Sequence, residues 1–152
     1  MYMKLDQDNA ITMEMPKDAH KIKLVRGLLG FSELREMEIV YDEGELPFMR
    51  LRETQQGPTK EEALEFFVVE PAGLIDNYSI RISEDDVEQL NISESDGTCL
   101  LNIVTIHNTG GGRVVTVNLV APLLINKKTL KGKQVIIENF NEYSPRHLLY
   151  ED

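Results

Sequence analysis

The chain has 152 residues, 41% of them hydrophobic, and its 26 acidic and 16 basic side chains give a net charge of −10. This length and composition suit a single domain, residues 1–152, that buries roughly 68–70% of the surface exposed by the unfolded chain. The negative charge argues against direct nucleic-acid binding, because the phosphates would be repelled. It suits a basic protein partner, although an acidic surface also keeps a protein soluble without any partner.

The sequence predicts a cytoplasmic protein without membrane contact. Its longest apolar stretches are interrupted by charge or proline well short of the ~20 residues that a membrane-spanning helix needs. The N-terminal residues are too acidic and polar for a signal peptide. Cys99 is the only cysteine, so an internal disulfide is excluded, and a lone thiol among apolar strand residues is expected to be buried and inert.

Short strands separated by turn residues are predicted along the first half of the chain. Alternation of apolar and polar residues with period two is typical of strands that have one buried face. Gly27 and Gly30 open a turn after the first of these strands, and Pro71 and Gly73 end a later one. The predicted strands lie over residues 13–25, 37–41, 48–52, 66–69 and 78–82.

One short helix is predicted after these strands. Ser83 is a good N-cap residue, and Glu84, Asp85 and Asp86 follow it, where the positive end of the helix dipole favours negative charge. The helix should reach Leu90, with its apolar residues inward. The acidic residues lack the ligand pattern of a calcium loop, so a solvated helix end is the default interpretation. All three acidic residues are candidate protein-binding residues, because carboxylates gathered on one helix would attract a basic partner.

A long hairpin and a sheet corner are predicted in the second half. Residues 98–107 and 113–120 form two strands joined by the glycine-rich segment 108–112, which is better explained as a hairpin tip than as a ligand loop. Pro122 then interrupts an apolar run, and proline cannot donate to a sheet ladder, so the chain must bend or reach an edge there. The flanking Asn118 and Asn126 carry amides that can satisfy the backbone groups left open at such a bend.

The sequence contains no catalytic or metal-binding pattern. His20, His107 and His147 lie far apart, and no second His or Cys stands at ligand spacing from any of them. No glycine-rich phosphate-binding motif follows a strand. We therefore expect no cofactor, no metal and no enzymatic activity.

A polar cluster lies near the end of the sequence, over Tyr143-Ser144-Pro145-Arg146-His147. Its side chains offer hydrogen-bond donors and an aromatic anchor of the kind that concentrates binding energy in protein interfaces. In the alternative interpretation, Tyr143 and Arg146 close the mouth of a barrel by bonding to backbone carbonyls. The remaining candidate protein-binding residues, beside the acidic ones of the helix, are Asn118, Pro122, Asn126, Tyr143, Arg146 and His147.

Many short strands, regular turns and one short helix predict a mainly β domain, built as an antiparallel barrel or sandwich. Several motifs then occur along the chain in a particular order. They are Gly27-Leu28-Leu29-Gly30-Phe31, Pro47-Phe48, Phe66-Phe67-Val68-Val69-Glu70-Pro71, residues 116–126 (T-V-N-L-V-A-P-L-L-I-N), residues 132–136 (G-K-Q-V-I) and residues 143–149 (Y-S-P-R-H-L-L). In this order, they resemble the flagellar assembly factor FliW family, over about residues 21–149.

The chain departs from the family's pattern in one region. Leu51-Arg52-Glu53 stands where many relatives have a Leu-Gln-Ser-like sequence, and a polar insert over residues 54–62 follows it. A role of that loop in relatives is therefore not carried over to this chain.

The resemblance implies a small closed antiparallel β-barrel and a non-enzymatic regulator with two protein partners. These partners would be flagellin, the filament subunit, and CsrA, a translational repressor that the protein would sequester. A β-barrel small-ligand-binding protein or enzyme is the alternative, with His107 and the Gly110 loop at the mouth and a deep pocket of convergent polar groups. An oligonucleotide-binding barrel fits least well, because it needs basic and aromatic residues on one face.

Overall fold

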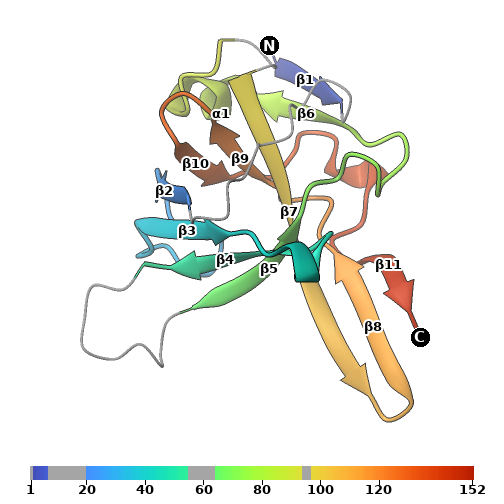
Figure 1. Cartoon of the computed structure of the whole chain (residues 1–152). Helices are drawn as coiled ribbons and strands as arrows, with labels where there is room; N and C mark the ends of the chain where they lie inside the picture. The colour runs from blue at the N-terminus through green and yellow to red at the C-terminus, as the bar shows by residue number, and fades with distance from the viewer. Residues whose placement is uncertain (1, 7–19, 55–63, 94–96) are drawn as a thin grey trace.

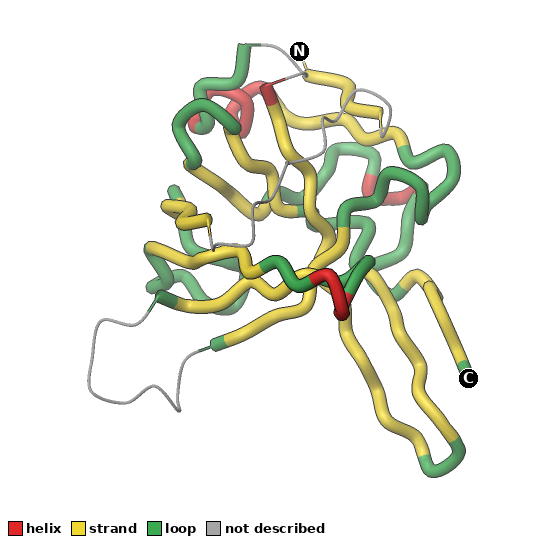
Figure 2. Tube along the Cα trace, in the orientation of Figure 1, coloured by secondary structure: helices red, strands yellow, loops and turns green. Residues whose placement is uncertain are grey.

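The strands of the barrel close on themselves through the longest strand of the chain. A computed structural model describes residues 2–6, 20–54, 64–93 and 97–152, and strands are the main regular secondary structure of this described part (Figure 2). Within it, nine strands form one sheet in the order β11-β8-β7-β5-β4-β3-β2-β10-β9, and an additional pairing of β7 with β9 closes the ring. The β-barrel expected from the resemblance is thereby confirmed.

The elements are shown in Figure 1, and their bounds are as follows. The strands are β1 (Tyr2–Asp6), β2 (His20–Leu24), β3 (Glu36–Val40), β4 (Met49–Glu53), β5 (Glu65–Val69), β6 (Ser79–Ser83), β7 (Thr98–Thr109), β8 (Gly112–Val117), β9 (Leu123–Asn126), β10 (Lys131–Gln134) and β11 (His147–Glu151), while α1 spans Glu84–Gln89 and the 3-10 helices η1 and η4 span Glu43–Glu45 and Phe140–Glu142.

Three features of the sheets differ from the sequence predictions. β10 pairs with β2 in parallel, so the barrel is not antiparallel throughout. β1 pairs with β6 in a separate two-stranded sheet, and β11 pairs with β8, although neither strand was predicted. The early part of the predicted first strand, residues 13–19, and nearly all of the polar insert lie outside the described residues.

Two hydrophobic clusters fill the molecule. The first gathers alternate residues of the barrel strands, such as Ile22, Ile39 and Leu51, and includes the fully buried Cys99. The second lies between the opposite faces of β7, β8 and β9 and the elements outside the ring, including Ile80 of β6 and Leu90 after α1. Cys99 is thus buried among apolar residues, as its sequence context predicts.

The helix and the sheet corner form where the sequence predicts them. Ser83 caps α1 by accepting a hydrogen bond from the Asp86 backbone N–H. β8 ends before Asn118, whose side-chain oxygen accepts from the backbone N–H groups of Val120 and Ala121, both at 3.0 Å. The Asn126 oxygen accepts from two backbone N–H groups of the next turn in the same way. These amides replace the ladder bonds that the chain gives up around Pro122.

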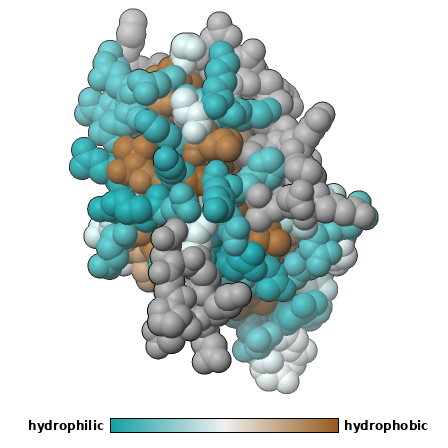
Figure 3. Space-filling model, turned by 60° about the vertical axis from the view of Figure 1, so that its left-hand side comes forward, coloured by the Kyte–Doolittle hydropathy of each residue, from teal (hydrophilic) through white to brown (hydrophobic). Residues whose placement is uncertain are grey.

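The surface carries no broad apolar face in the view of Figure 3, where apolar side chains emerge in separate patches among hydrophilic ones. No helix in the described ranges is both long and apolar enough to cross a membrane.

Candidate protein-binding surfaces

The hairpin of β7 and β8 extends beyond the barrel. The face of β7 that points into the barrel near its start is therefore exposed further along the strand. β7 pairs with β9 at its beginning, with β5 over Asn102 to Val104, and then with β8 as far as Thr109. Figure 1 shows this hairpin projecting away from the ring. Along one face of β7, Cys99 and Leu101 are buried in the barrel, whereas Thr105 and His107 are exposed.

A groove of about 400 Å³ lies on this face, where the hairpin leaves the barrel. Its lining comes from segments that are distant in sequence: the turn after β2, strands β5, β7, β8 and β10, and the segment before β11. The lining residues are Leu28, Leu29, Phe31, Phe66, Ile103, Thr105, His107, Thr116, Asn118, Gln134, Pro145 and Arg146.

The turn that lines one side of the groove is fixed by its first glycine. Gly27 has a φ of 67°, in the left-handed region, and a Cβ there would lie 2.6 Å from the carbonyl oxygen of Phe31. Leu28 and Phe31 close the turn through reciprocal backbone hydrogen bonds. Gln134 then ties the turn to the sheet corner, because its side-chain oxygen accepts from Leu29 N–H and its amide donates to the Ala121 carbonyl.

The polar groups of the groove have a basic character. Its lining residues include Arg146 and His107 but no Asp or Glu, although the whole chain has a charge of −10. The Arg146 guanidinium has no hydrogen-bond or ion-pair partner among the described residues, and only its backbone N–H is bound, to the Ser144 hydroxyl. The groove can therefore accept both apolar side chains and an acidic or carbonyl-rich segment.

A second hollow, of about 430 Å³, adjoins the groove and is lined by the acidic end of α1. Leu28, Leu29 and Gln134 line both hollows. The remaining lining residues of the second one are Arg26, Gly27, Ser83, Asp85, Asp86, Gln89 and Lys133. The basic groove and the acidic helix are thus neighbours, with Leu29 on the ridge between them.

Only two of the predicted site residues, Asn118 and Arg146, line the groove. Pro122 and Asn126 are buried, and the Asn126 amide donates to the Leu90 carbonyl at 2.8 Å, so both residues hold the corner together. His147 is exposed and begins β11, where it pairs with Val117.

Tyr143 bonds to the backbone, as the alternative interpretation of the polar cluster expected. Its hydroxyl accepts from Ser79 N–H at 2.8 Å and lies within hydrogen-bond distance of the Asn77 and Ser79 carbonyls. Its ring packs edge-on against Tyr78, at 5.0 Å between the centroids. Tyr143 therefore fastens the C-terminal segment to β6, whereas Arg146 lines the groove.

The acidic residues of α1 fall into two groups. Glu84 and Asp85 are exposed, as is Glu88 in the next turn. Asp86 instead forms an ion pair with Lys133 of β10, and only 14% of its side chain is exposed. The acidic surface available to a partner therefore includes Asp85 and Glu88, whereas Glu84, although exposed, already has an interaction of its own.

Sequence reasoning missed most of the apolar lining of the groove. Leu29, Phe31 and Phe66 belong to motifs that carry the family resemblance, but nothing local shows that these motifs meet in space. His107 was placed at the mouth in the alternative ligand-binding interpretation, and it does line the groove. Among the described residues, no group of three or more His, Cys, Asp or Glu side chains is placed to hold a metal ion.

Comparison with known proteins identifies the family of the chain. The model of the FliW protein family matches residues 4–149. The flagellar assembly factor FliW of Clostridioides difficile is 34% identical over 129 residues, which cover 85% of this chain and 93% of that protein. Its counterpart in Clostridium novyi is 31% identical, with 90% of each chain covered. A crystal structure of the flagellar assembly factor FliW superposes with a TM-score of 0.69 at 30% identity and covers 92% of this chain and 90% of the other. The chain therefore belongs to the FliW family of flagellar assembly factors.

Proposed function

We propose that the protein regulates flagellum assembly by binding flagellin and CsrA in alternation. Free protein would sequester CsrA, so that flagellin is translated, and accumulating flagellin would displace CsrA. The observation that carries the proposal is the convergence of the family-like motifs on the groove. The turn at Gly27, the strand at Phe66, the corner at Asn118 and the segment at Arg146 contribute to one lining.

The groove suits a segment of flagellin. The terminal segments of an unassembled filament subunit are expected to be amphipathic, and a groove beside a sheet can hold such a segment through its apolar side chains. Leu29, Phe31, Phe66 and Ile103 offer apolar contacts, and Leu29 is 53% exposed. The volume of the groove, about 400 Å³, lies in the range of ligand-binding pockets and can hold a few side chains.

The exposed acidic face of α1 suits CsrA. A protein that binds RNA carries basic side chains, and the exposed carboxylates of Asp85 and Glu88 would attract them. An acidic protein docked on or beside the RNA-binding surface would weaken RNA binding by steric exclusion or by repulsion of the phosphates. Because this face adjoins the groove, flagellin seated in the groove would lie close to bound CsrA.

A bulky residue in the groove tests the flagellin contact. Thr105→Arg places a long side chain in the groove and should weaken flagellin binding about tenfold or more, because it occupies the volume of the bound segment. The matched control is Asn108→Arg, on the exposed opposite face of the same strand. Isothermal titration calorimetry measures both variants. Equal binding by the two would place flagellin elsewhere, and full CsrA binding by both would show that they fold.

Charge reversal on α1 tests the CsrA contact. The variant Asp85→Lys/Glu88→Lys should lower the association rate with CsrA at low salt about tenfold, and added salt should reduce this difference. The control Glu138→Lys/Glu142→Lys makes the same change of charge at exposed positions outside both hollows. Stopped-flow or surface plasmon resonance gives the rates. If both variants slow association equally, the total charge of the protein attracts CsrA and α1 has no special part.

A further inference from the structure

β11 presents an open strand edge with exposed apolar side chains. It is the terminal strand of the sheet order, it pairs with β8 on one side, and no described strand pairs with its other side. In Figure 1 it lies at the rim of the molecule, with no element beyond it. Leu148 is 52% exposed and Tyr150 is 47% exposed. Open edges of this kind are templates for pairing with another chain.

The polar side chains along β11 run in a self-complementary order. Arg146 and His147 precede the apolar middle of the strand, and Glu151 and Asp152 follow it. If a second β11 pairs in the antiparallel direction about Leu149, Arg146 faces Asp152, His147 faces Glu151 and Leu148 faces Tyr150, each pair occurring twice. Opposite charges and apolar groups across a strand pair stabilise it, whereas like charges oppose it.

We infer that β11 is a homodimer surface, on which a second copy of this chain docks by antiparallel pairing of the two strands. Both copies would use the same surface in this contact, and the two-fold axis would pass between the two Leu149 residues. It joins the projecting strands of the two copies into one sheet in the order β7-β8-β11-β11-β8-β7. The inference does not depend on flagellin or CsrA.

Other arrangements of the two strands fit less well. Parallel pairing in register would place Arg146 against Arg146 and Glu151 against Glu151. A shift of the antiparallel register in one direction places Leu148 against Glu151, and a shift in the other places Pro145 against Asp152. An edge that opposes self-pairing can carry like charges, a bulge or only a short strand. β11 is short and has a bulge, which limits the strength of pairing, but the opposite charges at its two ends favour pairing with a second copy.

The existing contacts of β11 leave this edge available. Its register with β8 is interrupted by a bulge between Leu148 and Tyr150, and Leu149 packs against the hydrophobic cluster outside the barrel. Asp152 accepts from Arg113 N–H and forms an exposed ion pair with the Arg113 side chain, so Arg146 of a second copy would share this carboxylate. The contact is one short strand from each copy, so we expect a weak dimer that depends on protein concentration.

Analytical ultracentrifugation from micromolar to millimolar concentration tests the inference. The unchanged protein should pass from monomer to dimer over this range. The variant His147→Glu should weaken dimerisation about tenfold, because the introduced glutamate would face Glu151 at both ends of the contact. The variant Glu151→Lys removes both favourable pairs and should also weaken it.

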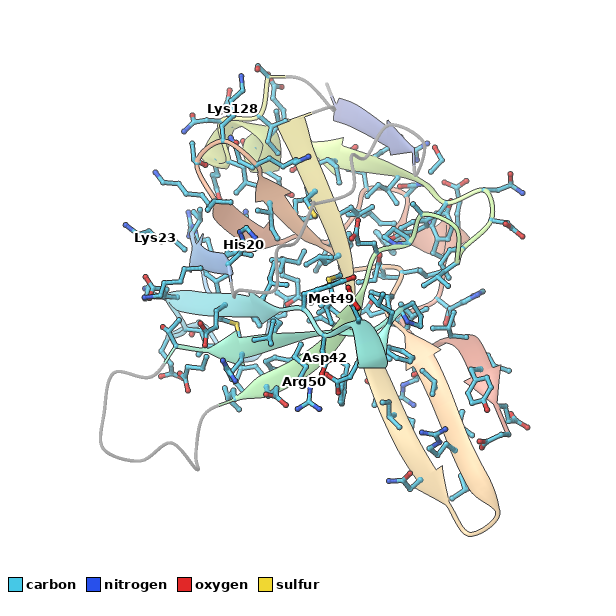
Figure 4. All side chains as sticks on the ribbon, in the orientation of Figure 1. His20, Lys23, Asp42, Met49, Arg50 and Lys128 are labelled. Atoms are coloured by element: carbon cyan, nitrogen blue, oxygen red, sulfur yellow. The ribbon has the colours of Figure 1, made fainter. Side chains whose placement is uncertain are left out.

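Equimolar mixing of the two single variants makes the test specific. In a mixed dimer, one end pairs glutamate with lysine and the other keeps His147 opposite Glu151, so the mixture should dimerise at least as well as the unchanged protein. The double variant His147→Glu/Glu151→Lys should dimerise again for the same reason. Lys128→Glu is the control, since Lys128 points outward on the side away from β11 (Figure 4). A protein that stays monomeric at all concentrations, or a dimer that neither single variant weakens, would overturn the inference.

Discussion

Among the described residues, Tyr78 has an ionisation that is strongly coupled to the fold. It is 1% exposed, and its hydroxyl donates to the Leu119 carbonyl at 2.6 Å and accepts from the Asn102 amide at 3.1 Å. Burial strongly raises the pKa of Tyr78, because the phenolate would lose its hydration, and the hydrogen bond from Asn102 offsets only part of this effect.

This raised pKa predicts a loss of stability in alkali. The unfolded chain releases the Tyr78 proton near the ordinary tyrosine pKa of about 10, whereas the folded protein retains it. The contribution of Tyr78 to the free energy of unfolding should therefore be constant below about pH 10, and it should decrease as the pH rises further. Urea unfolding between about pH 8 and pH 11, with tyrosinate absorbance recorded in parallel, measures both events. Tyr150→Phe should keep this alkaline loss, and Tyr78→Phe should remove part of it.

At the scale of elements, the Asn118 side-chain oxygen supports the corner between β8 and β9. Asn118→Ala leaves the N–H groups of Val120 and Ala121 without their acceptor and should cost about 1–3 kcal/mol in the free energy of unfolding. Asn118→Asp keeps an acceptor oxygen at the same position and should come close to the unchanged protein. Urea denaturation of the three proteins compares them. A loss as large in Asn118→Asp as in Asn118→Ala would mean that the corner is held by its packing rather than by these bonds.

The elements also show why sequence reasoning succeeded in some places and failed in others. The Ser83 cap and the Asn118 corner depend on bonds between residues two or three apart, so the local sequence predicts them. β11 forms because residues 147–151 meet β8 across a long stretch of chain, and the parallel pairing of β10 with β2 depends on closure of the ring. Neither has a local signal. The groove was missed for the same reason, since it exists only when the turn at Gly27 meets the hairpin.

At the scale of the whole molecule, charge is distributed unevenly on the two sides of the Leu29 ridge, which separates the groove from the second hollow. The groove has Arg146 and His107. The neighbouring hollow has the acidic end of α1, although Lys133 balances the Asp86 charge there and Arg26 also lines this hollow. Elsewhere some basic side chains form ion pairs with acidic ones. Arg50, for example, lies between Glu45 and Glu65 near η1 (Figure 4), and its hydrogen bonds to Glu45 raise its pKa. Under the proposed function, two partners of different character would bind next to each other on one acidic molecule.

Leu29 lies on that ridge, so its loss should affect both partners. Leu29→Ser removes an apolar side chain that is 53% exposed and should weaken flagellin and CsrA alike, by about fivefold if half of the usual burial energy of a leucine is lost. Ile136→Ser is the matched control, because Ile136 is 55% exposed and lines neither hollow. Calorimetry with each partner separates this variant from Thr105→Arg, which should weaken only flagellin. Association rates separate it from Asp85→Lys/Glu88→Lys, which should slow only CsrA. If Leu29→Ser weakens one partner and leaves the other unchanged, the two proteins do not meet at this ridge, and displacement of one by the other would have to act through a change in the fold.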